Sequence, residues 1–441
     1  MNLRGIVFIF LLNFTVSVSA NTQHDIAPNL LAFEGAMGFG KYTQGGNNGE
    51  VLIVTSLDDG EKNQAGTLRW AVSQPFPRLV VFDVSGIIEL KRPLEIKHDN
   101  ITIAGQTSPK GIVVKGAETQ VKANQVIIRH MRFRPGRGEG ESDALFIRNQ
   151  QDVIIDHCSL SWANDEVGSF YNNTRFTLQN SILSESLNNA GHSKGEHGYG
   201  GIWGGNYASF IQNVVVSHTS RTPRINGWRL GSPYPQEEEF VDIRNNVIAN
   251  WGTNSSYGGK EGRANLVANY FQPGPASKKI RFFQLWAIED ALSRLHIHNN
   301  YMHDHADMTQ NNLLGLDVKN AKRNEEAYSL TVAASVSLTP FESEAITLLN
   351  DETLTPQETW NELVVTRNVG ATKTRMAMGL DPVDSRMLEQ LKNNQYTSDD
   401  GIIDDELEVV DWLAYASYFS ASQTSQEALS TAQWRQLSEL K

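Results

Sequence analysis

The 441-residue sequence contains one cysteine, Cys158, so no disulfide can form within the chain. Basic residues are also scarce: 38 Lys and Arg stand against 50 Asp and Glu, which gives a net charge of −12. This deficit argues against a protein that binds nucleic acid or anionic membranes. The 14 prolines and 35 glycines indicate many turns rather than disorder. Because Cys158 lies in an apolar run, we expect it to be a buried packing residue and not a nucleophile.

Long apolar runs are confined to the N-terminus. Arg4 provides a positive charge, residues 5–16 form an apolar core, and Val18-Ser19-Ala20 resembles a cleavage site of small residues. We therefore predict a secretory signal peptide, residues 1–20, and export of the mature chain. The apolar core is too short to span a bilayer, and we expect no membrane span in the mature protein.

Seven apolar, β-branched runs resemble one another and share a His or Asn at a matching position. They are VIIRHMRF (126–133), VIIDHCSL (153–160), FTLQNSIL (176–183), FIQNVVVS (210–217), VDIRNNVI (241–248), NLVANYF (265–271) and LHIHNNYM (295–302). The matching residues are His130, His157, Asn180, Asn213, Asn245, Asn269 and Asn299, at intervals of 27, 23, 33, 32, 24 and 30 residues. A period of this size, built from strands, indicates stacked β-coils.

The pattern predicts an all-β fold, a right-handed parallel β-helix over residues 51–305. A leucine-rich-repeat horseshoe has a similar period but needs a regular leucine signature that is missing. The recurring Asn fits a turn with left-handed backbone, where its amide can bond to the Asn of the next coil. We interpret residues 21–50 as an irregular N-terminal cap and residues 67–72 as a short helix.

Residues 306–441 lack the repeat and are expected to form helices and loops packed on the β-helix. Thr355 and Glu358, with Pro356 between them, indicate a helix start, and Asp384 is a second candidate. The acidic tract 399–408 is interpreted as a solvated loop or helix start. It lacks the spacing of an EF-hand.

Charged residues gather on the coils that carry the longest insertions. Asp143 follows a glycine-rich turn, and Asp165 and Glu166 lie one coil further on. Lys194 lies in the insertion HSKGEHGYGG, and the segment SHTSRTPR contributes cationic side chains. The cationic residues of and after that segment are Arg221, Arg224 and Arg229.

In these segments the chain resembles the pectate lyases of polysaccharide lyase family 1. ITIAGQT (101–107) resembles an early coil of that family and VIIDHCSLSW (153–162) a later one, while DEVGSFY and RTPR resemble its calcium-binding and catalytic segments. The resemblance covers residues 32–300, and LDPVDSRM (380–387) resembles a tail segment of bacterial relatives.

The resemblance implies calcium-dependent β-elimination on polygalacturonate by a secreted enzyme that we expect to be a monomer. Asp143, Asp165 and Glu166 would bind Ca²⁺, which also explains how an acidic protein binds a polyanion. Arg221 would be the base.

Lys194, Arg224 and Arg229 would hold substrate carboxylates. Two departures affect these assignments. The family has a second arginine two residues beyond the position of Arg224, and its Glu-x-x-x-Asp calcium pair is not intact here.

Other interpretations remain open at the level of sequence. A pectin lyase, or a lyase for another uronate polymer, would share the fold, and a pectin lyase would need no calcium. A hydrolase of the polygalacturonase type needs paired carboxylates in a motif that we do not find. A non-catalytic β-helix that binds carbohydrate or mediates adhesion is the alternative outside enzymes. His192 and His197 could line the groove, but a zinc site would need further ligands.

Overall fold

The computed structural model describes residues 30–138, 140–288, 291–420 and 428–439. The predicted signal peptide, residues 1–20, lies outside the described residues. Residues 31–441 form one compact unit. Within the described ranges, no helix has the length and apolar character needed to cross a membrane.

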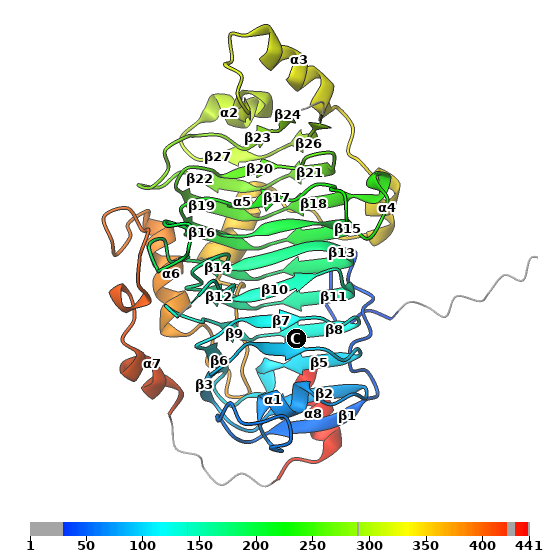
Figure 1. The fold of residues 1–441 in the computed structure, drawn as a ribbon, viewed down its shortest axis with the longest axis vertical. Helices are drawn as coiled ribbons and strands as arrows, with labels where there is room; N and C mark the ends of the chain where they lie inside the picture. Colours follow the sequence, from blue (N-terminus) through cyan, green and yellow to red (C-terminus); the bar gives the residue numbers. More distant parts are fainter. Residues whose placement is uncertain (1–29, 139, 289–290, 421–427, 440–441) are drawn as a thin grey trace, which may run out of the picture. The chain divides into compact units, whose positions relative to one another are not determined.

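The chain winds into coils of three strands, and strands of successive coils pair in parallel (Figure 1). Face 1 consists of β4 (Leu94–Ile96), β7 (Thr119–Val121), β10 (Leu145–Arg148), the first parts of β13 (Gly168–Gln179) and β15 (Ile202–Ile211), β17 (Arg224–Ile225), β20 (Ser256–Gly258), β23 (Phe283–Leu285) and β28 (Leu316–Val318). The predicted parallel β-helix is confirmed.

The two other faces follow the same order of coils. Face 2 consists of β1 (Glu50–Val54), β2 (Arg78–Phe82), β5 (Ile101–Ala104), β8 (Val126–Arg129), β11 (Gln151–Asp156), the second parts of β13 and β15, β18 (Phe240–Arg244), β21 (Arg263–Val267), β26 (Arg294–His298) and β29 (Val336–Ser337). Face 3 consists of β3 (Gly86–Glu89), β6 (Ile112–Lys115), β9 (Arg132–Phe133), β12 (Ser159–Ser161), β14 (Ile182–Ser184), β16 (Val214–His218), β19 (Val247–Trp251), β22 (Tyr270–Gln272) and β27 (Tyr301–Met302).

Alternate side chains of each strand point into the coil and stack on those of the next coil. Val153 and Ile155 of β11 are fully buried in this core, and Phe176 lies between Phe170 and Phe210 at ring-centroid distances of 5.3 and 5.6 Å. Full burial of one such side chain contributes about 1.5–3 kcal/mol. Neighbouring coils therefore stabilise each other, and no coil is stable alone.

At the turn between faces 2 and 3, we expected one column of stacked residues both to have left-handed backbone and to form the amide ladder. In the structure, two neighbouring columns take these two roles separately. Left-handed backbone occurs at His130, His157, Asn180, Gln212, Asn245, Ala268 and Asn299. The hydrogen-bonded ladder lies one residue later, where Asn246 Nδ2 donates to Asn269 Oδ1 and Asn269 Nδ2 to Asn300 Oδ1, each at 2.9 Å. Asn213 and Asn269 belong to the ladder and not to the left-handed column, so the predicted alignment of the seven matching residues mixes the two columns.

The N-terminal segment does not cap the β-helix, contrary to our expectation for residues 21–50. Its described part crosses the outside of face 2, where Met37 N donates to Gln179 Oε1 at 2.7 Å and Gly46 N to Thr102 Oγ1 at 2.9 Å. The predicted short helix is α1 (Leu68–Val72), which begins at the N-cap Thr67. Its apolar side chains join the core, so α1 closes the first coil.

Parallel pairing continues beyond residue 305, where we expected the β-helix to end. β28 pairs with β23 and β29 with β26, so two further strands extend the stack. Helices α2 (Ala306–Gln310) and α3 (Glu326–Ser335) lie between these strands in the chain and pack at this end of the stack. The short runs LDV and VS were too brief for the repeat pattern to reveal.

The rest of the chain returns along the outside of the β-helix (Figure 1). α4 (Ser343–Leu349) precedes α5 (Pro356–Trp360), which begins with the predicted capping box of Thr355 and Glu358 and runs into a π-turn, residues 361–365. α6 (Pro382–Asn393) packs on β16 and β19, and α7 (Trp412–Phe419) contacts β3. α8 (Thr431–Ser438) packs against β1.

The N-cap of α6 is Asp381 and not the predicted Asp384, because Pro382 fixes the first helical position. Asp381 and Asp384 bind Arg132 and Arg134 of the β-helix in a fully buried cluster that also contains Tyr415 of α7. The Arg134–Asp384 contact is 2.6 Å. These contacts fix the C-terminal segment over face 3.

Candidate active site

The side of the β-helix formed by face 1 carries the candidate site. The C-terminal segment packs on faces 2 and 3 and the N-terminal segment on face 2, whereas outward side chains of face 1 such as Phe146, Tyr171 and Tyr257 are partly exposed. The turns that precede the strands of face 1 bear the acidic residues. Asp143 lies two residues before β10, and Glu166 lies two residues before β13. Because Leu145 pairs with Gly168, Asp143 and Glu166 occupy equivalent places on successive coils.

Asp143, Asp165 and Glu166 form the acidic cluster. One ligand oxygen from each lies within 4.8 Å of those from the others. Burial raises the pKa of Asp143 well above its usual range, and the charges of Asp165 and Glu118 act in the same direction. Burial also raises the pKa of Glu118. Negative charge is thus concentrated where desolvation disfavours it, and a bound cation would relieve this.

Arg221 lies between β16 and β17 and ion-pairs with Glu166. Its guanidinium carbon stands 4.1 Å from the ring centroid of Tyr199, and its backbone is left-handed, with φ 56°. Burial lowers the pKa of Arg221, and the charge of Arg224 lowers it further, against the raising effect of Tyr257. The residue expected to be the base thus lies against the acidic cluster.

The other predicted cationic residues lie around Arg221 at different depths. Arg224 begins β17 and is partly exposed. Burial lowers the pKa of Arg229, followed by the charges of Arg224 and Arg221, which places Arg229 among them. Lys194 is exposed on the insertion between β14 and β15, and its backbone N–H donates to His192 Nδ1 at 3.1 Å.

His192 and His197 lie beside the acidic cluster, with their rings stacked at a centroid distance of 3.7 Å. His197 Nε2 is 2.9 Å from Asp165 Oδ1, and His192 Nε2 is 3.7 Å from the same oxygen. Because Nδ1 of His192 accepts the N–H of Lys194, the proton of the neutral ring is on Nε2, the atom that a metal would need. Both rings therefore contact Asp165, which also belongs to the acidic cluster.

No family model matches the chain. The chain is 33% identical over 395 residues to a probable pectate lyase C of Aspergillus flavus, covering 86% of this chain and 81% of that protein. It is 31% identical over 411 residues to a probable pectate lyase C of Aspergillus fumigatus, covering 89% and 83%. The chain belongs to the pectate lyase family.

The folds of solved structures agree with this membership. The major cedar pollen allergen jun a 1 has a TM-score of 0.53 at 18% identity, covering 76% of this chain and 92% of that one. A pectate lyase variant of Xanthomonas campestris has a TM-score of 0.50 at 15% identity, covering 76% and 98%. This pectate lyase is therefore a polysaccharide lyase. The 86% coverage exceeds the stretch 32–300 that carries the motifs, so the similarity reaches into the C-terminal segment.

Three residues of the site were missed from the sequence: Glu118 beside Asp143, and Tyr199 and Tyr257 beside Arg221. Tyr199 forms isolated parallel bridges with Glu166 and Ser220, which place it in register with Glu166 on the next coil. Tyr257 of β20 pairs with Arg224. In this pectate lyase, the pairing register of face 1 is what identifies these residues, because each precedes or lies in one of its strands. The strands are too short to be recognised by periodicity in the sequence.

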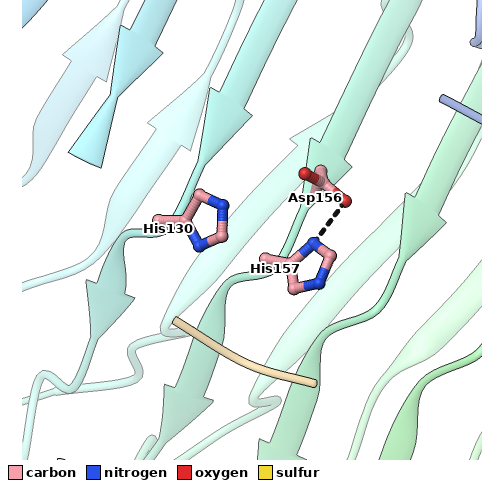
Figure 2. A group of neighbouring side chains, drawn as sticks. All are labelled: His130, Asp156 and His157. Atoms are coloured by element: carbon pink, nitrogen blue, oxygen red, sulfur yellow. Dashed lines mark hydrogen bonds and ion pairs between the residues drawn. The ribbon is translucent and has the colours of Figure 1, made fainter. Parts of the chain in front are cut away.

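A second group of titratable side chains lies at the turn between faces 2 and 3 (Figure 2). His157 Nδ1 is 2.7 Å from Asp156 Oδ1, and the ring of His130 stacks on that of His157 at 4.9 Å. Arg129 Nε donates to the other oxygen of Asp156 at 2.8 Å. Since both oxygens of Asp156 have protein partners, the group is part of the scaffold and not of the candidate site.

Cys158 follows His157 and is fully buried, as expected. Burial raises the pKa of its thiol to about 12, so the side chain remains a thiol.

Proposed function

We propose that this pectate lyase is a secreted enzyme that cleaves de-esterified polygalacturonate by calcium-assisted β-elimination. The observation that carries the proposal is the contact of Arg221 with Glu166 beside the buried carboxylate of Asp143. It brings a guanidinium with lowered pKa to a candidate cation site. The proposed secretion rests on the predicted signal peptide, and we expect a monomer.

The residues of the acidic cluster fit calcium. Asp143, Asp165 and Glu166 offer hard carboxylate oxygens from two successive turns, as Ca²⁺ prefers. The carboxylate of Glu166 is buried, and its Oε1 atom lies against the guanidinium of Arg221. Asp143, Asp165 and Glu166 would hold calcium, which would supply positive charge to offset the negative charge that develops on the substrate.

Arg221 is the proposed base. In β-elimination the proton on C5, next to the carboxylate, leaves first, and the bond between C4 and the glycosidic oxygen then breaks. The proton goes to the base, the leaving oxygen takes a proton from water, and a C4–C5 double bond remains. An arginine can accept a proton only if its pKa is lowered, and burial and Arg224 both lower that of Arg221. Its contact with Tyr199 orients the guanidinium.

Arg224, Arg229 and Lys194 are proposed to hold substrate carboxylates. Arg224 projects from β17 next to Tyr257, and Arg229 follows it on the next loop. The place of the family's second arginine is taken by Asn226, which is buried and donates to Asn172 Oδ1 at 3.1 Å. We therefore assign to Arg224 the carboxylate contact that a second arginine would make.

The test is an elimination assay on de-esterified polygalacturonate, followed by the ultraviolet absorbance of the unsaturated ends. We expect activity with added calcium and its loss in excess chelator. Full activity in chelator would contradict the calcium assignment and favour the mechanism of a pectin lyase. Reducing ends without ultraviolet absorbance would contradict elimination itself.

A further inference from the structure

Face 1 carries a second set of outward side chains, displaced by two residues from the position of Arg224. On β10 and β13 it presents Arg148 and Tyr171, which pair in register. Past β23 it presents Trp286, and past β28 Lys319, because Leu285 pairs with Val318. The pairing of Trp203, Ile225, Gly258 and Leu285 places Gly204, Asn226 and Gly259 between them. Aromatic and cationic residues are thus grouped at two separate places along this row.

Each group is a cation held over an aromatic ring. The guanidinium carbon of Arg148 lies 5.2 Å from the ring centroid of Tyr171, and the Nζ of Lys319 lies 4.9 Å from that of Trp286. Tyr171 is on β13, two strands before β17, and Trp286 directly follows β23, two strands after β17. With strands about 4.8 Å apart, each ring is about 10 Å along the stack from the strand of Arg224.

Neither cation has an anionic partner among the described residues. Arg148 is exposed and lies over the Tyr171 ring, and Lys319 is partly exposed and lies over the Trp286 ring. The acidic neighbour of Lys319, Asp317, is neutralised by Arg281 at 2.6 Å. An exposed cation–aromatic contact stabilises a fold by only about 0.5–1 kcal/mol. The charge of each pair is available to a ligand.

We propose that the Arg148–Tyr171 and Lys319–Trp286 pairs are binding subsites, each for one uronate residue of an acidic polysaccharide. The ring stacks on the apolar face of the sugar, and the cation pairs with its carboxylate. A polymer with one carboxylate on every sugar can satisfy both pairs at once, whereas a neutral glycan can use only the rings. This inference rests on the proposed function. It adds how far the bound polysaccharide extends along face 1 on each side of the cleaved bond.

The test compares Arg148→Gln, Lys319→Gln and the double variant on long polygalacturonate with calcium. We expect each single change to raise KM about three- to tenfold, with kcat unchanged. The two factors should multiply in the double variant, because the sites are far apart and share no partner. Arg148→Lys should retain most of the affinity. Arg367→Gln, which removes an exposed cation from the C-terminal segment over face 3, is the matched control and should behave as the wild type.

Unchanged KM in both single variants of an enzyme that cleaves polygalacturonate would overturn the subsites and leave the proposed function intact. A wild type that does not cleave polygalacturonate would instead overturn the proposed function. In that case calorimetric titration of the same proteins with polygalacturonate decides the subsites. Weaker binding by the variants supports them, and equal binding overturns them.

Discussion

The backbone N–H of Glu166 donates to Oδ1 of Asp143 at 3.0 Å, which joins the acidic turns of two successive coils. The bond orients the Asp143 carboxylate toward Asp165 and Glu166 before any ligand binds. It also offsets only part of the desolvation, because the pKa of Asp143 stays raised by burial. The position is thus prepared for a cation and unfavourable without one.

Asp143→Asn should separate these two effects. The amide oxygen can still accept the N–H of Glu166, while one buried charge is removed. Without calcium we expect the free energy of unfolding to stay equal or rise by about 1 kcal/mol. The stabilisation by calcium, about 2.7 kcal/mol at a hundred times the dissociation constant, should be lost. Thermal denaturation with calcium and with chelator measures both. Asp399→Asn, in the exposed acidic tract, is the control. Retention of the full calcium shift in Asp143→Asn would exclude Asp143 as a ligand.

Arg221→Lys should abolish turnover without unfolding the protein. An ammonium keeps the positive charge but cannot cover the Tyr199 ring and reach Glu166 with the same geometry. Loss of a general base costs about 10²–10⁴ in rate. Initial rates and circular dichroism of the two proteins provide the measurement. A variant with more than a tenth of the wild-type rate would mean that turnover does not require the guanidinium of Arg221.

Glu239 should make the stability of the fold depend on pH. It is fully buried between Tyr234 and the N–H of Gly205, and burial raises its pKa to about 7. A raised pKa in the folded state means stability that is present below about pH 4.5 and is lost as the pH rises through about 7. Relative to Glu239→Gln, the wild type should lose about 3 kcal/mol between pH 5 and pH 9. Urea denaturation at both values tests this, and identical pH dependence in the two proteins would refute it.

Asp381→Asn should strongly destabilise the protein. The carboxylate neutralises Arg132 and Arg134 in a site with no exposure to solvent, and Arg132 and Arg134 hold its pKa well below the usual range against the effect of burial. Removing one partner of a buried ion pair costs about 3–5 kcal/mol. Glu389→Gln, which breaks the exposed pair with Arg367, should cost less than about 1 kcal/mol. Equal losses in the two variants would show that the buried cluster does not hold α6 in place.

The parallel β-helix could be predicted from the sequence because runs such as 153–160 and 176–183 include long apolar strands of face 2. The strands of face 1 could not be predicted, since strands such as β17 (RI) and β20 (SYG) are too short to show a period. The turn residues His157 and Asn213 looked equivalent, because Asn suits both left-handed backbone and an amide ladder. Only the register separates these two roles.

For the site, motif order placed Asp143, Asp165 and Glu166 on adjacent turns and Arg221 two coils further along, and the structure brings their side chains together. Tyr199 could not be found this way, because its role depends on the bridge between its backbone and that of Glu166. The same holds for the C-terminal segment, whose docking depends on long-range pairs such as Arg134 with Asp384. Such contacts join residues far apart in the chain and leave no local pattern.

The return of the C-terminal segment also affects how the molecule comes apart. Trp434 of α8 packs against Leu79, Val81 and Ala104 in the first coils, and Gln106 Nε2 donates to Ser438 O at 2.6 Å. An ordinary solenoid loses its coils one by one from either end, because each coil contacts only its neighbours. Here the last residues of the described chain rest on the first coils. Fraying of the N-terminal coils therefore requires release of α8, and unfolding becomes a concerted event rather than a progressive one.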